Sequence, residues 1–315
     1  MSVPHTVRAG VVLAFVAALL SGVAIYLNGT IVRDFPDQTL LAAVRNGAVG
    51  AVLLAVLLAQ GRGAELRPAA PRQRLAMVVL GVFGGGIAFA LFFTGLAQAS
   101  ATDAAIIQKT MFVWVAILAV PILGERLGAI QVAGLVLLLG GTLLIAPAGS
   151  LGFGPGEILI LLATLLWAGE VIVARWLLGT TAALPAVTAR MALGGVVLFG
   201  LVAFDGHLAQ LGAWSAQQWG EVALTGVILL GYVGTWYAAL KRAPASMVTS
   251  VLVVAAVITA GLQALAAGAL PAPVRLEGLG LVTLGTCLVT AATVWWLGRQ
   301  PRLAAVEASA AAPRG

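Results

Sequence analysis

The sequence is poor in charge, in cysteine and in histidine. Aspartate, glutamate, lysine and arginine make up 9% of its 315 residues, whereas soluble globular domains carry roughly 25%. The one cysteine, Cys287, excludes an intrachain disulfide, and the two histidines, His5 and His207, are too far apart in sequence to suggest a metal site. No phosphate-binding P-loop and no nucleophile elbow occurs either. We therefore expect no metal, no cofactor, no enzymatic activity and no ATP-driven transport by this chain alone.

Apolar residues take the place of the missing charge. They form 61% of the chain, and the mean hydropathy is +1.08. A soluble protein of this composition lacks the polar groups to cover its surface, so lipid must surround most of it. The formal net charge is +6, but the basic residues lie between apolar runs and form no stripe on one face. We therefore expect no nucleic-acid partner.

Ten apolar runs are long enough to cross a bilayer as helices, which takes about 20 residues each. Lipid offers no hydrogen bonds to the backbone, so each span should be helical. The first run ends in Asn28-Gly29-Thr30 rather than in a small-residue cleavage site, which favours a spanning helix over a signal peptide. The predicted spans are residues 10–27, 38–59, 75–97, 103–120, 127–146, 157–178, 185–204, 219–240, 245–267 and 276–297.

The basic residues predict that both chain ends face the cytoplasm. With the N-terminus inside, twelve of them fall on the inner side and only two, Arg33 and Arg275, on the outer side. This asymmetry follows the positive-inside rule. We expect a multi-pass protein of the inner or plasma membrane of the cell. Residues 298–315 are rich in alanine and are expected to form a disordered cytoplasmic tail.

Matches at a fixed offset indicate that the chain consists of two similar halves. In the second span of each half the offset is 145 residues, and Arg45 meets Arg190. Each half has five spans, an odd number, so the second half must enter the membrane upside down. This inverted-repeat plan is common among secondary transporters. Later in the halves the offset is 144 residues and matches Gly134 with Gly278, Gly141 with Gly285, and Thr142 with Thr286.

Several of these residues resemble a known family. Residues 121–127 (PILGERL), followed by Gln131 and the glycines at 134, 140 and 141, resemble the end of an EamA repeat. The run Leu165-Leu166-Trp167-Ala168 resembles the opening of the second repeat, and Arg45 and Arg190 match the arginine often found in the second helix of each unit. From residue 9 to residue 297, the chain is similar to EamA-type members of the drug/metabolite transporter superfamily.

The resemblance implies an all-α integral membrane protein with two inverted five-helix repeats, at residues 9–146 and 157–297. It also implies export of amino acids and other small metabolites, often driven by ion gradients. Pro121, Gly124 and Glu125 are candidate gating or loop residues. The second half departs from the pattern, because Gly268-Ala269 stand where the first half has Gly124-Glu125. The acidic corner is therefore not repeated.

Ionisable residues inside the spans are the main site candidates, because a charge at mid-membrane costs at least about 2.5–3.5 kcal/mol. Glu170 is predicted to couple protons or bind a substrate amine, or else to pair with Arg190 or Lys109. Lys109 is predicted to bind a substrate carboxylate or to pair with Glu170, or else to snorkel toward the outer interface. Arg45 and Arg190 are candidates for holding helix carbonyls or closing a gate. Arg175 is expected to snorkel.

Aromatic residues are the second group of candidates for lining a cavity. Trp167 lies three residues before Glu170, on the same face of its helix. Tyr232 and Trp236 are four residues apart and also share a face, and Trp114 lies in a span that can face the centre. The alternative for Tyr232, Trp236 and Trp114 is packing between helices or contact with lipid.

The leading hypothesis is a secondary transporter that exports amino acids or related small metabolites by alternating access, with Glu170 and Lys109 near the site. The alternative is an exchanger of anionic metabolites such as nucleotide sugars or sugar phosphates, for which Arg45, Lys109 and Arg190 supply cations. A membrane-embedded enzyme or sensor is a remote alternative, because clustered His, Asp or Ser residues at helix ends are missing. The expected partners are a small-molecule substrate and membrane lipid, in a monomer or a homodimer.

Overall fold

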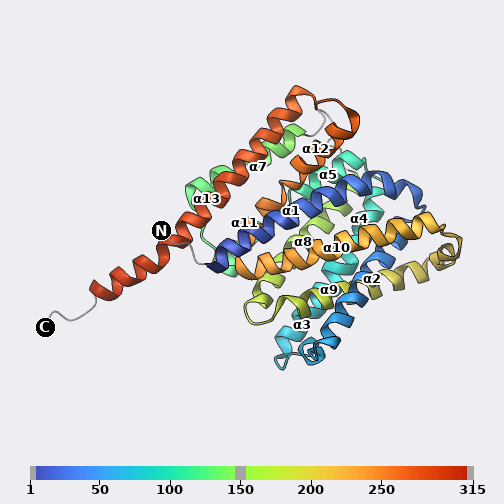
Figure 1. Cartoon of the computed structure of the whole chain (residues 1–315), viewed down its shortest axis with the longest axis horizontal. Coiled ribbons are helices and arrows are strands. Elements are labelled where there is room, and N and C mark those ends of the chain that lie inside the picture. Colours follow the sequence, from blue (N-terminus) through green and yellow to red (C-terminus); the bar gives the residue numbers. More distant parts are fainter. Residues whose placement is uncertain (1–4, 146–153, 311–315) are drawn as a thin grey trace.

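The computed structural model describes residues 5–145 and 154–310. Within these residues the chain is helical, without any β-strand, and long helices pack side by side (Figure 1). The α-helices are α1 (His5–Ile31), α2 (Gln38–Ala59), α3 (Pro71–Val79), α4 (Ala88–Leu96), α5 (Ala101–Lys109), α6 (Met111–Leu123), α7 (Ala129–Ile145), α8 (Pro155–Leu178), α9 (Ala183–Phe204), α10 (Ala216–Arg242), α11 (Ala245–Leu252), α12 (Ala255–Ala267) and α13 (Pro273–Ala310). They are joined by the 3-10 helices η1 (Val32–Asp34), η2 (Gly63–Leu66) and η4 (His207–Ala213) and by the π-helical segment η3 (Leu80–Ile87).

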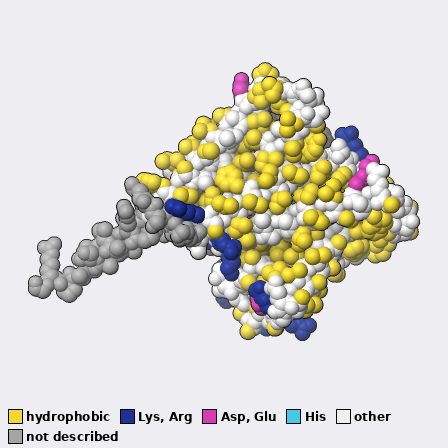
Figure 2. All heavy atoms as spheres, in the orientation of Figure 1, with side chains coloured by type: hydrophobic (Ala, Val, Ile, Leu, Met, Phe, Trp, Pro, Cys, Tyr) yellow, Lys and Arg dark blue, Asp and Glu magenta, His cyan; other side chains and the backbone are white. Residues whose placement is uncertain are grey.

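The described residues form nine helical stretches that are long and apolar enough to cross a membrane, and α7 is a tenth, shorter apolar helix. Apolar side chains dominate the face seen in Figure 2, and its few charged side chains lie near the periphery. Large apolar side chains such as Val227 and Leu265 are 69% and 81% exposed, as expected for surfaces in contact with lipid. The all-α membrane fold predicted from the sequence is confirmed. Ala146, the predicted end of the fifth span, lies outside the described residues.

Three predicted spans are not single regular helices. The third consists of α3, η3 and α4, with the glycine run at residues 84–86 inside the π-helical segment. The fourth is interrupted at Thr110, between α5 and α6, and the ninth at residues 253–254, between α11 and α12. Such breaks in the hydrogen-bond ladder are frequent at functional sites.

The last helix is longer than the sequence indicates. The tenth span is predicted to end at residue 297 and to be followed by a disordered tail, but α13 continues to Ala310. Alanine has the highest helix propensity of all residues, which accounts for a continued helix in this alanine-rich stretch. Residues 311–315 lie outside the described part of the chain.

The two halves repeat their local structure at the offset read from the sequence. Helices α5 and α11 begin at Ala101 and Ala245, and α6 and α12 end at Leu123 and Ala267, in both cases 144 residues apart. Both α6 and α12 are closed by a glycine in the left-handed region, with φ of +68° at residue 124 and +62° at residue 268. Glycine carries no Cβ penalty in that conformation, which explains why the duplicated helix ends keep it.

Helices α7 and α13, the fifth of each half, cross through matched glycines. A Cβ on Gly134 would lie 2.9 Å from the carbonyl oxygen of Gly285, and a Cβ on Gly141 would lie 2.6 Å from that of Gly278. Because Gly134 matches Gly278 and Gly141 matches Gly285, each glycine meets the counterpart of the other. This reciprocal contact is the signature of a two-fold relation between the halves.

Helix α9 approaches its neighbours closely at small residues. A Cβ on Gly194 would lie 2.6 Å from the backbone of Gly85 in η3, and a Cβ on Gly195 would lie 2.9 Å from Gly47 in α2. Small residues let helix backbones pack this tightly in membranes. The contact with η3 also fixes Arg190, one turn earlier on α9, against the π-helical segment.

We predict that Gly194→Ala destabilises the protein by about 1–3 kcal/mol, the usual range for overpacking. The added methyl group meets backbone atoms of Gly85, which cannot rotate away. Gly200→Ala on the same helix is the matched control, because a Cβ there has open space around it. Thermal unfolding of both variants in detergent measures the difference. Equal unfolding temperatures for the two variants would contradict the prediction.

Candidate functional site

Glu170 of α8 and Arg190 of α9 form an ion pair inside the helix bundle. The Arg190 Nε donates to Glu170 Oε1, and its Nη2 donates to Oε2 at 3.2 Å. The hydroxyl of Tyr237 in α10 donates to Oε1 at 3.0 Å. The side chains of Glu170 and Arg190 are only 7% and 12% exposed. One carboxylate therefore connects three helices, and both of its oxygens are occupied.

The π-helical segment η3 packs against this ion pair. The indole Nε1 of Trp167 donates to the carbonyl oxygen of Gly84 at 3.1 Å. A Cβ on Gly84 would overlap the Glu170 carboxylate, so a larger residue at this position would displace that carboxylate from its place against Arg190. The ring of Phe89 lies 5.9 Å from the Arg190 guanidinium carbon and packs edge-on against Trp167. A cation above an aromatic face in a dry interior is stabilised by the ring quadrupole.

The arginine of the first repeat has a different partner. Arg45 of α2 donates from Nη1 to the Asn28 side-chain oxygen of α1 at 3.1 Å. Its buried Nε has no hydrogen-bond partner among the described residues. In both repeats the arginine of the second helix thus bonds to a polar side chain of the first helix, but only Arg190 meets an opposite charge.

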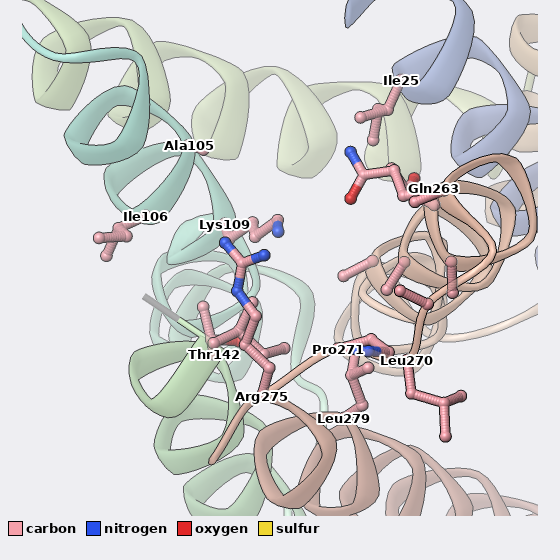
Figure 3. Close-up of a pocket in the computed structure, with 17 residues that line it drawn as sticks. Ile25, Ala105, Ile106, Lys109, Thr142, Gln263, Leu270, Pro271, Arg275 and Leu279 are labelled. Atoms are coloured by element: carbon pink, nitrogen blue, oxygen red, sulfur yellow. The ribbon is translucent and has the colours of Figure 1, made fainter. Parts of the chain in front are cut away.

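Lys109 does not join the ion pair but lines a cavity of about 500 Å³ at one end of the bundle. Figure 3 shows Lys109, Arg275 and Gln263 directed into the same space from three helices, α5, α13 and α12. No described residue forms a hydrogen bond or an ion pair with Lys109, Arg275 or Gln263. Most of the remaining wall is apolar and includes Ile25, Ile106, Ile145, Leu270 and Leu279.

Glu125 lies at the opposite end of the ninth span and caps it. Its carboxylate accepts hydrogen bonds from the backbone N–H of Ala245 at 2.5 Å, and from the backbone N–H and hydroxyl of Ser246 at 3.1 Å and 2.5 Å. These N–H groups begin α11 and have no partner within the helix. A carboxylate also interacts favourably with the positive end of the helix dipole. The α6–α7 connection of the first half is thereby held against the second half.

The matched position in the second half lacks this contact. Ala269 stands where the first half has Glu125, and it lines the cavity with Lys109 and Arg275. An alanine side chain has no oxygen to accept from the start of α5, which is capped instead within its own segment by Ser100. One end of the bundle is therefore closed by hydrogen bonds and the other contains a cavity.

The other predicted site residues do not gather around one centre. Trp114 donates from Nε1 to Thr110 of its own span at 3.1 Å. Tyr232 and Trp236 stack on each other, with ring centroids 6.2 Å apart, as their spacing predicts. Pro121 lies inside α6, just before the turn at Gly124, and lines an apolar groove between α6 and α7.

Sequence reasoning missed three residues that the structure brings into these sites. The sequence places Arg275 only in an outer loop, but it lies in the first turn of α13 and reaches the cavity of Lys109. Tyr237 and Gln263 were not singled out. The spacing of four residues draws attention to the helix face shared by Tyr232 and Trp236. Tyr237 is the next residue and lies off that face, so the spacing does not indicate its contact with Glu170. No local signal distinguishes Gln263 from a packing residue.

Two comparisons place the sequence among known proteins. A model of the EamA-like transporter family matches residues 8–146 and 154–291, one match in each half. The uncharacterized transporter YyaM of Bacillus subtilis (strain 168) is 29% identical over 215 residues, which cover 65% of this chain and 69% of that protein.

A comparison of folds agrees with the sequence matches. A solved structure described only as "Crystal structure of protein" superposes with a TM-score of 0.75 at 22% identity. The match covers 91% of this chain and 98% of the other. At this identity the likeness establishes a shared fold and carries nothing about a substrate.

Proposed function

Because this chain belongs to the EamA-like transporter family, we propose that it is a secondary active transporter that exports a small metabolite by alternating access. A multi-pass transporter of this family needs a central path that opens to each side in turn. The two inverted halves supply that geometry, because a two-fold relation between them lets rocking of one half against the other expose the centre to either side in turn.

The observation that carries the proposal is the difference between the two ends. Glu125 holds the start of α11 at one end, and the cavity of Lys109 and Arg275 lies at the other. The cavity lies along the second part of the ninth span, from Ala256 onward, so residues 245–255 separate it from the closed end. This is the arrangement expected for a carrier resting with one side closed and the other accessible.

We assign the closed end to the cytoplasm. Arg126, Arg175, Lys241 and Arg242 are at that end, and basic residues concentrate on the cytoplasmic side of membrane proteins. The side chain of Lys241 donates to the carbonyl oxygen of Thr181 at 2.8 Å, which joins the eighth span to the connection before α9. In this orientation both termini are cytoplasmic, the protein resides in the inner or plasma membrane, and the cavity opens outward.

Amino acids and related carboxylates are the substrates that the family resemblance implies, and anionic metabolites are the alternative. Both classes carry an acidic group, which the cations of the cavity suit. The negative charge of Glu170 is already neutralised by Arg190, and the carboxylate also accepts from Tyr237, so it offers no unpaired charge to a substrate ammonium group. This occupancy favours the anionic class. A gradient of a coupled ion or of a counter-substrate supplies the energy.

Counterflow in proteoliposomes tests the proposal. Vesicles are loaded with one member of a panel of unlabelled amino acids and organic anions, and uptake of the labelled compound is followed with and without a pH gradient. We expect saturable uptake that internal substrate accelerates, because a carrier reorients faster when loaded. Protein-free vesicles are the control. Uptake that internal substrate never accelerates, or no uptake across the panel by well-folded protein, would refute alternating-access transport.

A further inference from the structure

The charge balance of the cavity is one-sided. The only charged side chains that line it are Lys109 and Arg275, both positive, and no carboxylate is among its described lining residues. The two side chains come from opposite halves of the molecule, Lys109 from α5 and Arg275 from α13. Two like charges that face one space repel each other, so their placement together needs a compensating interaction.

Other cations embedded in the bundle have such an interaction. Arg190 is paired with Glu170, Arg45 bonds to Asn28, and Lys241 bonds to a backbone carbonyl. Lys109 and Arg275 bond to none of the described residues. An ammonium group within a span is costly unless it is solvated or paired, so the missing partner points to a ligand.

The repeat itself does not require these charges. At the matched positions of the other half, 144 residues away, Lys109 is replaced by Val253, Arg275 by Gln131 and Gln263 by Ala119. Gln131 bonds to Thr293 at 2.8 Å and to a backbone N–H at 2.7 Å, so it serves packing. The repeat fold therefore forms without a cation at any of these three matched positions. Lys109 and Arg275 are therefore particular to the open end.

We infer that this cavity binds the anionic group of the transported solute, a carboxylate or a phosphate, between the Lys109 ammonium and the Arg275 guanidinium. The Gln263 amide is placed to bond a neighbouring polar group of the same solute. The inference rests on the proposed transport function and names its substrate class. Two positive charges with no acidic counterpart select a solute with net negative charge over a zwitterionic amino acid.

The size and the walls of the cavity fit such a solute. A volume of about 500 Å³ lies within the range of small-molecule sites, roughly 300–1,000 Å³. Its isoleucine and leucine side chains offer contacts for an apolar body, while the cations take the charged end. An anionic lipid headgroup offers the same phosphate chemistry at the membrane surface, so the experiment must separate the two sources.

Ligand binding to the full-length protein in neutral detergent tests the site. The probes are succinate and inorganic phosphate, compared with zwitterionic alanine and neutral succinamide, and the readout is isothermal titration. We expect the two anions to bind the wild type and the other two probes not to bind. Lys109→Gln and Arg275→Gln should each weaken anion binding about tenfold or more, the loss expected for one hydrogen bond between charged groups.

Two further variants make the comparison specific. Arg33→Gln removes an exposed arginine beyond the end of α1 that does not line the cavity, and it should bind like the wild type. Lys109→Arg keeps the charge and should retain most of the affinity. Equal anion binding by wild type and the Lys109→Gln, Arg275→Gln double variant would overturn the inference.

A lipid arm and a transport arm complete the test. Adding phosphatidylglycerol should change the dissociation constant of succinate by no more than about twofold, a difference well below 1 kcal/mol. Binding of the lipid without any binding of succinate or phosphate would overturn the inference. In proteoliposomes, amino-acid flux that is unchanged in the double variant would refute the site and leave the transport function standing. Anion binding lost in the double variant, without any flux by the wild type, would refute transport and leave the site standing.

Discussion

Replacing Glu170 with glutamine is expected to lower the free energy of unfolding by about 3–5 kcal/mol, the cost of leaving one partner of a buried ion pair alone. The Arg190 guanidinium then keeps its charge at a place where it is only 12% exposed. It also loses the bidentate acceptor that fixes α9 against α8. Unfolding of purified protein in mixed detergent and dodecyl sulfate measures the difference.

A double-mutant cycle separates the pair from its surroundings. Because removing both charges leaves no unpaired ion, Glu170→Met with Arg190→Met should cost much less than the sum of the single changes. Tyr237→Phe removes a single hydrogen bond to the carboxylate and should cost about 1.5–3 kcal/mol. If Glu170→Gln unfolds like the wild type but loses flux driven by a pH gradient, the carboxylate is a coupling group and the structural role is wrong.

Removing the carboxylate of Glu125 is expected to open the closed end. Even one of its hydrogen bonds to α11 is worth about 1.5–3 kcal/mol, which corresponds to a population shift of about 10–150-fold. The measurement is the rate at which a membrane-impermeant maleimide labels a cysteine at position 249. Thr249 is one turn into α11 and only 1% exposed. Cys287 is exposed and is first replaced by serine.

The matched control for Glu125→Ala is Glu157→Ala. The Glu157 side chain also caps a helix, accepting from the Gly154 N–H at 2.9 Å, but the contact lies within its own segment and joins no two halves. We expect Glu125→Ala to raise the labelling rate at least tenfold, for the population shift given above, and Glu157→Ala to leave it unchanged. The same labelling rate in both variants would show that Glu125 does not close this end.

Local patterns predicted most of the fold. Runs of apolar residues gave the spans, and the matched glycines gave the repeat, because both depend on chemistry within a short stretch of chain. The break at Thr110 and the extension of α13 to Ala310 were not predicted. Apolar periodicity does not distinguish a continuous helix from two helices in line, and helix propensity outweighs polarity in an alanine-rich tail.

The sites were harder to predict, because they depend on contacts between distant segments. Pairing of Glu170 with Arg190 was one of two alternatives, since both lie deep in neighbouring spans and a buried charge needs a partner. The approach of Arg275 to Lys109 was not foreseen. It requires α13 to begin beside the end of α5, a position set by the glycine crossing of α7 and α13 rather than by any signal near either residue.

The reciprocal glycine crossing of α7 and α13 has a consequence for ancestry. A contact in which each side uses the same residues is one that two copies of a single short chain can make with each other. A five-helix precursor that inserted into the membrane in both orientations would have formed this crossing as an antiparallel homodimer. Fusion of two such copies would free them to diverge, which accounts for a glutamate at one corner and an alanine at the matched corner.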